Sequence, residues 1–310
     1  MLIIKSILVY LIYVGTYHSI ITCRNSETSI EDCILSIYNQ TVKPSYILVI
    51  DDGSTDNTSY ILKKMKDSIS NLFIITNPDL GYDITRVPFN YNKAIAFIKN
   101  NQLESTDYHM IASDDAIYER DYADKIIKFM DKNRNHVFAS GNYDKNKYSA
   151  PRGSGRFVQT SYFDEFYEYY PEKMGYETAI IHTADMLGYD YAVLDDARFE
   201  HTRGLGTQHH FYDWGASMKA LGYHPLFVLN RFLISFISGK PMGRLGAISM
   251  LYYYIRSKPK KEGYFSKYDK DLINFIRKNQ IAQLRRIRFR RTSRFVKGFV
   301  VKILNHMLTK

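Results

Sequence analysis

Apolar runs and amphipathic segments alternate over roughly the first 130 residues of the chain. The apolar runs are residues 17–25, 45–50, 71–77 and 108–115, and the amphipathic segments are residues 26–41, 55–69 and from Asn90 onwards. In the amphipathic segments, apolar side chains recur every three or four positions, which predicts helices. The apolar runs are rich in β-branched residues and lack polar alternation, which is typical of strands buried on both faces. We therefore predict an α/β fold with a mostly parallel central sheet flanked by helices. We expect Ser26 or Thr28 to cap the helix predicted over residues 26–41.

The pattern changes after about residue 140. In the later part, the spacing predicts a helix from Tyr176 to Leu187 and then a short strand over residues 189–196. Residues 223–254 are very apolar but are interrupted by Gly239, Pro241, Gly243 and Gly246. This stretch therefore lacks the run of about twenty apolar residues that a membrane-spanning helix needs.

Positive charge is concentrated at the C-terminal end. The net charge is +10, yet residues 1–270 hold 31 Lys/Arg and 31 Asp/Glu, whereas residues 271–310 hold eleven and one. A nucleic-acid-binding protein usually also shows a basic surface on its folded body, so we expect no nucleic-acid partner. Basic and apolar residues interleave over 275–310, which favours an amphipathic helix in peripheral contact with an anionic membrane. The alternatives are a solvated charged face or an RNA contact.

Residues 1–15 form an apolar segment that contains Lys5. The segment is short for a spanning helix, and the A-x-A-like cleavage site of a signal peptide is missing. We favour a packing or membrane-leaning segment, with a signal peptide as the alternative. The only two cysteines, Cys23 and Cys33, form neither a CxxC pair nor a zinc site. We therefore expect a reducing, cytoplasmic location, with the protein peripheral at the inner face of the cell membrane.

Pairs of carboxylates follow two of the predicted strands. Asp51 and Asp52 end the run YILVIDD, and Asp114 and Asp115 end YHMIASDD. Ligands of open α/β sheets bind beyond the carboxyl ends of the strands, where carboxylates can hold a divalent cation, a base or a sugar. The phosphatase-type signature D-x-D-G-T would need an acid at Ile50, so we exclude it. The motifs G-x-x-x-x-G-K-[ST] and G-x-G-x-x-G are also missing at strand–helix turns.

Two longer stretches carry a family resemblance. Residues 18–58 (HSIITCRNSETSIEDCILSIYNQTVKPSYILVIDDGSTDNT), followed later by residues 110–122 (MIASDDAIYERDY), resemble the inverting family 2 glycosyltransferases of bacterial and archaeal glycan assembly. The resemblance is strong over residues 17–125 and continues more weakly to Arg231. It implies the GT-A fold and transfer of a hexosyl group from a nucleoside diphosphate sugar to an acceptor hydroxyl, with inversion. The acceptor would be a glycan or a lipid-linked glycan.

The resemblance also implies a domain organisation. The expected parts are the apolar segment 1–15, a GT-A domain over residues 16–231 and a helical membrane-associating extension over residues 232–310. Within the GT-A domain, residues 16–135 would bind the nucleotide and residues 136–231 would face the acceptor.

Donor-binding residues are implied at the ends of the early strands. Asp51 and Asp52 occupy the positions that hold the nucleotide's base and ribose in the family. Cys23 and Arg24 lie in the turn after the first strand and would line the same pocket. Arg86 lies where the family often has a basic residue near the nucleotide.

The family's metal loop, D-A-D-D, aligns with residues 112–115. Ala112 replaces its first acid, while Asp114 and Asp115 are retained, so the resemblance implies a Mn²⁺ or Mg²⁺ site at Asp114 and Asp115, with Asp114 also contacting the donor. The motif FEHTRG resembles a late family motif, in which His201 would be a metal ligand and Arg203 a partner of the diphosphate. The departure at Ala112 leaves the strictness of the metal requirement open.

The family's general base is a carboxylate at the start of a helix. Glu177 in MGYETA occupies that place, and Glu172 and Asp185 are its nearest rivals. Glu177 also suits an ordinary role in a first helical turn, where the helix dipole favours acids. Asp51 and Asp52 could likewise form a capping turn.

Two functions from other classes stay open. A nucleotidyltransferase uses a similar sheet and similar acids, and a non-catalytic module could bind nucleotide sugars without turnover. The adjacent His209 and His210 do not converge on one ion, and Trp214 suits packing.

Overall fold

The computed structural model describes residues 14–143, 150–151, 153–203, 212–240 and 242–285. Most of the apolar segment 1–15, the pair His209 and His210, and the basic residues 286–310 therefore lie outside the described residues. The chain divides into two compact units. The first comprises Met1–Pro171 and Gly188–Gly204, and the second comprises Glu172–Leu187 and Leu205–Lys310.

The secondary structure alternates as expected in the first unit and is helical in the second. The described strands are β1 Tyr17–Cys23, β2 Ile47–Asp51, β3 Leu72–Thr76, β4 Tyr108–Ser113, β5 Ala116–Tyr118, β6 His136–Asn142, β7 Arg156–Gln159 and β8 Asp190–His201. The described helices are α1 Ile30–Tyr38, α2 Thr58–Ser68, the 3-10 helix η1 Ile84–Arg86, α3 Val87–Asn100, α4 Tyr122–Lys132, α5 Thr160–Phe166, α6 Tyr176–Met186, α7 Tyr212–Ala220, α8 Pro225–Ser238 and α9 Gly243–Arg256. A further helical stretch is described over residues 270–285.

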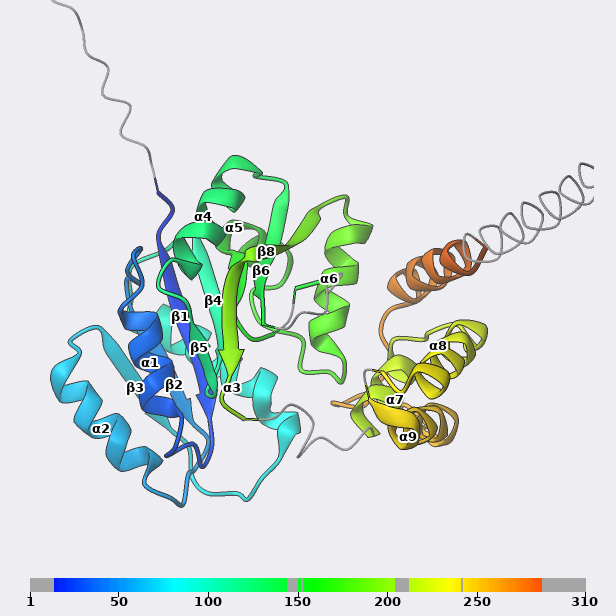
Figure 1. Ribbon diagram of the computed structural model, residues 1–310, viewed down its shortest axis with the longest axis horizontal. Coiled ribbons are helices and arrows are strands. Elements are labelled where there is room, and N and C mark those ends of the chain that lie inside the picture. The colour runs from blue at the N-terminus through cyan, green and yellow to red at the C-terminus, as the bar shows by residue number, and fades with distance from the viewer. Residues whose placement is uncertain (1–13, 144–149, 152, 204–211, 241, 286–310) are drawn as a thin grey trace, which may run out of the picture. The chain divides into compact units, whose positions relative to one another are not determined.

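The described strands of the first unit form one mixed sheet of eight strands in the order β3-β2-β1-β4-β7-β6-β8-β5 (Figure 1). β3, β2, β1 and β4 are mutually parallel, as the alternation of strands and helices predicts. β7 runs antiparallel to both β4 and β6, and β5 pairs antiparallel with β8. The parallel half therefore matches the prediction, and the second half adds antiparallel strands that the sequence pattern did not indicate.

Both faces of the parallel half are covered by helices, which explains its unbroken apolar runs. One apolar cluster joins Ile21, Val49 and Met110 of the strands to Ile34 of α1, Leu62 of α2 and Ile126 of α4. Side chains at neighbouring strand positions point to the opposite face, where α3 packs on β1 and β2. Figure 1 shows α1 and α2 on the same side of the sheet. The core therefore fixes the strands on both faces and leaves their ends to form loops.

The register aligns the carboxyl ends of the strands. Cys23 at the end of β1 pairs with Asp51 at the end of β2, and Asp51 pairs with Thr76 at the end of β3. On the other side of β1, Thr22 pairs with Ser113 at the end of β4. The turns that follow these strands therefore start at one level and along one edge of the sheet.

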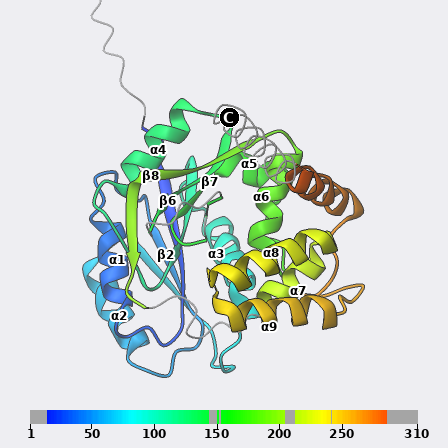
Figure 2. The ribbon, with the colours of Figure 1, turned by 45° about the vertical axis from the view of Figure 1, so that its right-hand side comes forward.

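The second unit is built from helices that share an apolar core. Met218 of α7, Val228 of α8, Met250 of α9 and Ile276 of the last described helix belong to one buried cluster. α8 and α9 pack side by side (Figure 2). α8 ends at Gly239, whose φ of +69° suits glycine at a helix C-terminus. Within the described residues, every helix is too short or too polar to cross a membrane.

Three element boundaries differ from the sequence-based expectation. The residue that precedes α1 is Ser29, which makes no side-chain capping hydrogen bond, while the hydroxyl of Ser26 contacts Arg24 and Asp114 instead. The third helix begins at Val87, three residues earlier than expected, since Pro88 is well suited to a first helical turn. β8 extends to His201, because its second half pairs with β5.

Candidate functional site

Two acidic turns lie at the carboxyl edge of the parallel strands. The first follows β2 and contains Asp52, and the second follows β4 and contains Asp114 and Asp115. The turn after β1 lies between them and contacts both. In that turn, the Arg24 guanidinium donates to the carbonyl oxygens of Asp52 and Gly53, both at 2.5 Å.

Ser26 joins the β1 turn to the second acidic turn, because its hydroxyl donates to the carboxylate of Asp114. Arg24 also reaches Asp79 Oδ1 at 2.6 Å. The turn after β1 is thus hydrogen-bonded to the turns that follow β2, β3 and β4. This network holds the strand ends together as one site within the first unit.

Asp51 and Asp52 have different surroundings although they are adjacent. The buried Asp51 carboxylate accepts hydrogen bonds from the backbone N–H of Ser54 at 2.9 Å, from its hydroxyl at 2.6 Å and from the hydroxyl of Ser59. These contacts tie the loop after β2 to Ser59 in the first turn of α2. In this structure the Asp51 carboxylate therefore shapes the loop, and the side chain of Asp52 is the one that meets groups from other loops.

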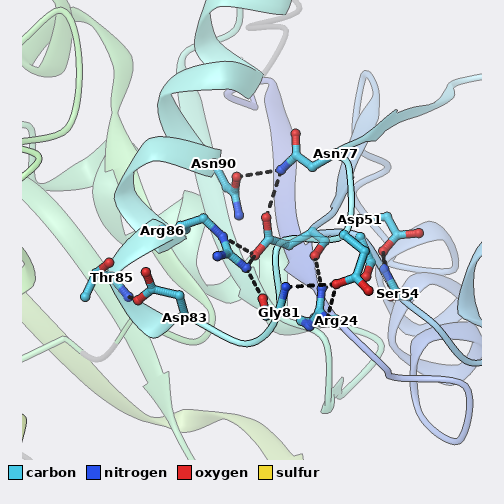
Figure 3. Close-up of polar contacts among 12 residues, drawn as sticks. Arg24, Asp51, Ser54, Asn77, Gly81, Asp83, Thr85, Arg86 and Asn90 are labelled. Carbon is cyan, nitrogen blue, oxygen red and sulfur yellow. Dashed lines mark hydrogen bonds and ion pairs between the residues drawn. The ribbon is translucent and has the colours of Figure 1, made fainter.

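The Asp52 carboxylate is the centre of a polar network (Figure 3). Arg86 contacts Oδ2 through Nε at 2.9 Å and through a terminal nitrogen at 2.8 Å. Asn77 donates to Oδ1 at 2.9 Å, and its own amide is fixed by Asn90 and by the Lys93 ammonium at 2.7 Å. Burial raises the pKa of Asp52, but the hydrogen bonds from Arg86, Asn77 and Asn90 outweigh it and hold the pKa below its ordinary value. Asp52 is thus an ionised acceptor on a rigid support.

Cys23 contributes to the site through its backbone. Its carbonyl accepts the N–H of Asp52 at 2.9 Å, while the side chain is only 3% exposed and belongs to the sheet core. Burial raises the pKa of the thiol well above its ordinary value. The structure therefore places the Cys23 side chain in packing and its peptide group at the edge of the site.

Gly53 allows the first acidic turn to form. Its φ is +73°, and a Cβ atom would come within 2.6 Å of the Cα of Asp79 and of the carbonyl oxygen of Pro78. We predict that Gly53→Ala lowers the free energy of unfolding by roughly 3 kcal/mol, since backbone strain and a backbone clash add up. Chemical denaturation measures this loss.

Gly81→Ala is the matched control for that prediction. Gly81 has a φ of +76°, but a Cβ atom at this position would have no neighbouring atom within 4 Å. Its alanine variant should lose only about 1–2 kcal/mol from the left-handed conformation. Equal losses at the two positions would contradict the close approach at Gly53.

The second acidic turn is held by residues from the end of β8. Asp115 Oδ1 lies 2.9 Å from Nδ1 of His201 and accepts the Ser113 hydroxyl at 2.7 Å. A terminal nitrogen of Arg203 donates to Asp114 Oδ1 at 2.6 Å, and Arg203 Nε lies 3.5 Å from Asp115 Oδ2. The four residues predicted from the motifs SDD and FEHTRG therefore converge, although 86 positions separate Asp115 from His201.

The two carboxylates of this turn differ in their electrostatics. Burial raises the pKa of Asp114, and the charge of Arg203 and the Ser26 hydroxyl only partly oppose it. Burial also raises the pKa of Asp115, but hydrogen bonds from His201 and Ser113 and the charge of Arg203 outweigh it and lower the pKa to about 2. Asp115 is thus the carboxylate that stays ionised at every ordinary pH.

The donor atoms suit a divalent cation only in part. Asp114 and Asp115 offer hard oxygens and His201 offers an imidazole nitrogen, which Mn²⁺ accepts. Ala112 supplies no ligand, and among the residues described no group of three or more His, Cys, Asp or Glu side chains is arranged to hold a metal ion. A cation held here would need its remaining ligands from phosphate oxygens and water.

The predicted general base and its rivals belong to the second unit. Glu177 lies half-buried in the first turn of α6, two residues after Gly175, which precedes the helix with a φ of +83°. Asp185 lies near the other end of α6 and accepts a hydrogen bond from Asn279 at 3.3 Å, and Glu172 lies on the exposed segment before the helix. Of the three, Glu177 alone has the helix-start position that the family resemblance requires.

Three residues of the site were missed by reasoning from the sequence. Asn77 ends the run NLFIITN, so the rule that strand ends carry ligands could have identified it. Asn90 and Lys93 lie one helical turn apart on α3, and their role depends on where that helix packs. No short motif marks them.

Comparisons with known proteins identify the family and the fold of this chain. The family model described as "Glycosyl transferase family 2" matches residues 19–197. An uncharacterized glycosyltransferase of Mycoplasma genitalium is 31% identical over 119 residues, which is 37% of this chain and 37% of that protein. An uncharacterized glycosyltransferase of Haemophilus influenzae is 32% identical over 130 residues, which is 40% of this chain and 36% of that protein. Each match thus spans little more than a third of the relative's length.

A solved structure shares the fold. The mannosyltransferase PcManGT of Pyrobaculum calidifontis, solved in complex with GDP-Man and Mn²⁺, superimposes with a TM-score of 0.54. The superposition covers 79% of this chain and 70% of that chain at 15% sequence identity. This likeness confirms the α/β fold expected from the sequence, namely the GT-A fold followed by C-terminal helices.

Proposed function

Because this chain belongs to glycosyl transferase family 2, we propose that it transfers a hexosyl group from a nucleoside diphosphate sugar to an acceptor hydroxyl, with inversion at the anomeric carbon. The observation that carries the proposal is the convergence of two kinds of polar group at one sheet edge. Asp52 with Arg86 forms an acceptor–donor pair on one side, and Asp115 with His201 and Arg203 forms a charged group on the other. The pair of Asp52 and Arg86 can hydrogen-bond the base and ribose of a nucleotide. The group that contains Arg203 can bind its diphosphate.

In this proposal Asp52 recognises the base and ribose of the donor. Its ionised carboxylate accepts hydrogen bonds from N–H or hydroxyl groups, and Arg86 and Asn77 keep it in place. Asp51 and Arg24 act as positioning residues that fix the loop around Asp52. The carbonyl oxygen of Cys23 accepts the N–H of Asp52 and so holds the backbone of the same loop.

The diphosphate lies near Arg203 in this proposal. The Arg203 side chain is 38% exposed, so phosphate oxygens can reach it while its guanidinium stays hydrogen-bonded to Asp114. Asp115, Asp114 and His201 are the residues that would hold Mn²⁺ or Mg²⁺, which when bound stabilises the negative charge of the leaving diphosphate. Arg203 stabilises the same charge.

Glu177 is the proposed general base, which would take the proton of the acceptor hydroxyl as the sugar is transferred. The acceptor is a glycan or lipid-linked glycan. The basic residues 275–310 are proposed to contact an anionic membrane surface, with the protein peripheral at the inner face of the cell membrane. Residues 232–310 would then form the membrane-associating extension of a GT-A domain that spans residues 16–231.

Calorimetry with a panel of nucleotide sugars tests the proposal, with Mn²⁺, with Mg²⁺ and with a chelator. We expect one donor to bind in the presence of a metal and more weakly with the chelator. Release of free nucleoside diphosphate and a glycosylated acceptor would establish the transfer, whereas release of pyrophosphate from a nucleoside triphosphate would identify a nucleotidyltransferase. Donor binding without turnover of any acceptor would favour a binding module.

Asp52→Asn should weaken donor binding about 10- to 100-fold, because the neutral amide loses charge-assisted hydrogen bonds. The dissociation constant from the same calorimetry measures this effect. Asp83→Asn is the matched control: Asp83 accepts the Thr85 N–H at 2.9 Å at the start of η1, and asparagine caps equally well. Figure 3 shows this cap beside the Arg86 network. An unchanged dissociation constant for Asp52→Asn would remove Asp52 from the donor site.

A further inference from the structure

Two helices of the second unit carry apolar side chains on the side that faces away from their own core. Val228 of α8 and Ala247, Met250 and Tyr254 of α9 are buried in one apolar cluster. The opposite sides of both helices therefore face outward from that cluster. On a helix that meets water, this outer side normally carries polar residues.

The outer side of α8 is apolar instead. Leu226, Leu229, Leu233 and Ile237 are all at least 44% exposed, and Ile237 reaches 75%. Their spacings of three, four and four residues place them in one stripe along the helix. Phe236 lies beside the stripe and is also exposed.

The outer side of α9 repeats this arrangement. Leu245, Ile248, Tyr252 and Ile255 are spaced by three, four and three residues, and their exposed fractions lie between 47% and 80%. A single exposed leucine needs no explanation, but two adjacent helices with continuous outward stripes indicate a binding surface. We call these eight residues the α8–α9 apolar surface.

The charged residues of the segment that contains both helices are of one sign. Residues 214–261, which contain both helices, hold eight Lys/Arg and no Asp/Glu. The remaining residues of the first 270 hold 23 Lys/Arg and 31 Asp/Glu, so the overall balance conceals a strong separation of charge. Arg244, Arg256 and Lys258 are exposed, and none of them forms an ion pair with another described residue. A surface that is apolar at its centre and basic around it complements an anionic lipid bilayer.

We propose that the α8–α9 apolar surface inserts into the headgroup region and upper acyl chains of a bilayer that contains anionic lipid. The basic residues of 214–261 then contact the lipid phosphates, and their aliphatic stems extend along the apolar surface. This surface overlaps the membrane-associating extension proposed above for residues 232–310, but it is distinct from the basic residues 275–310. It rests on the exposed residues of α8 and α9 and is independent of the proposed sugar transfer.

A polarity-sensitive label tests insertion directly. The native cysteines Cys23 and Cys33 are buried, so Ile237→Cys and Leu245→Cys can each be labelled with nitrobenzoxadiazole in the full-length protein. We expect the emission of both labels to rise several-fold with vesicles of phosphatidylcholine and phosphatidylglycerol in equal parts. Leu80→Cys, at a 69% exposed residue of the first unit, is the matched control and should stay unchanged.

Every other outcome overturns the proposal. No rise at either label would mean that the surface stays out of the bilayer, whether or not residues 275–310 bind vesicles. A rise with protein concentration alone would identify a second copy of the chain as the occupant. An equal rise with pure phosphatidylcholine would remove the requirement for anionic lipid.

Vesicle flotation gives the corresponding affinity. The double variant Leu233→Gln with Ile237→Gln should lower the vesicle partition coefficient about tenfold, since two apolar side chains no longer leave water. Tyr60→Gln with Leu80→Gln removes two similarly exposed apolar residues from the first unit and should have no effect. Donor binding measured on the same variants separates this result from the sugar-transfer proposal. Equal partition of the wild type and the α8 variant would overturn the proposal.

Discussion

Glu177→Gln should lower kcat by about 10²–10⁴-fold while the dissociation constant of the donor stays within a factor of about two, because a general base acts on the acceptor and contributes on this scale. Glutamine keeps the size and the hydrogen-bonding oxygen of the side chain but cannot take a proton. Glu177 lies in the first turn of α6, and the family resemblance is the reason for proposing it as the base. The measurement is a steady-state transfer assay with the donor identified by calorimetry.

Asp185→Asn and Glu172→Gln are the matched controls for this prediction. Asp185 lies near the end of the same helix and Glu172 lies before it, so both changes remove a carboxylate from the same part of the chain. We expect both variants to keep kcat within about threefold of the wild type, as is usual away from the chemistry. A full loss in either variant, with normal turnover in Glu177→Gln, would transfer the role of base to that residue.

The parallel half of the sheet could be predicted because its physics is local. Unbroken β-branched runs such as residues 45–50 mark strands that are buried on both faces, and the amphipathic segments between them can return only as crossover helices. The antiparallel strand β7 has only four residues. Its place between β4 and β6 depends on contacts far apart in the sequence, so no periodic pattern reveals it.

The difference between Asp51 and Asp52 follows from the geometry of a strand. Successive side chains of a strand point to opposite faces, so two adjacent acids at a strand end have different neighbours. Asp51 still belongs to β2 and turns toward Ser54 and Ser59, while Asp52 meets Arg86 and Asn77. The sequence motif identifies the turn, and the alternation of side chains along the strand explains why Asp51 and Asp52 have different contacts.

The convergence of Arg203 on Asp114 and Asp115 could be expected only from the family resemblance. The two segments are linked by the pairing of β5 with β8, in which Ala116 lies opposite His201. This pairing places the end of β8 beside the acidic turn. Residues 116–118 form too short a run to predict such a pair from pattern alone.

Asp115→Asn should lower kcat/KM for transfer by about 10³-fold, since electrostatic stabilisation of a leaving group is often the largest single contribution to catalysis. Asp115 is the carboxylate whose pKa is lowered, to about 2, so it carries a full negative charge beside Arg203, the proposed partner of the diphosphate. Asparagine is nearly the same size but neutral, so it cannot balance Arg203 or attract a cation. Calorimetry with Mn²⁺ and with chelator should then give the same weak donor affinity.

Asp131→Asn separates this effect from a general loss of a buried acid. The Asp131 carboxylate accepts the backbone N–H of Gly15 at 2.9 Å and the hydroxyl of Tyr108 at 2.7 Å, so it is also largely buried and hydrogen-bonded. Gly15 precedes β1 and Tyr108 begins β4, which places Asp131 at the amino ends of the strands, opposite the acidic turns. Its asparagine variant should lose stability but keep kcat/KM and the metal-dependent part of donor binding. If Asp115→Asn instead kept its metal response, the charge at that position would be structural, and Arg203 would be the remaining group that stabilises the leaving diphosphate.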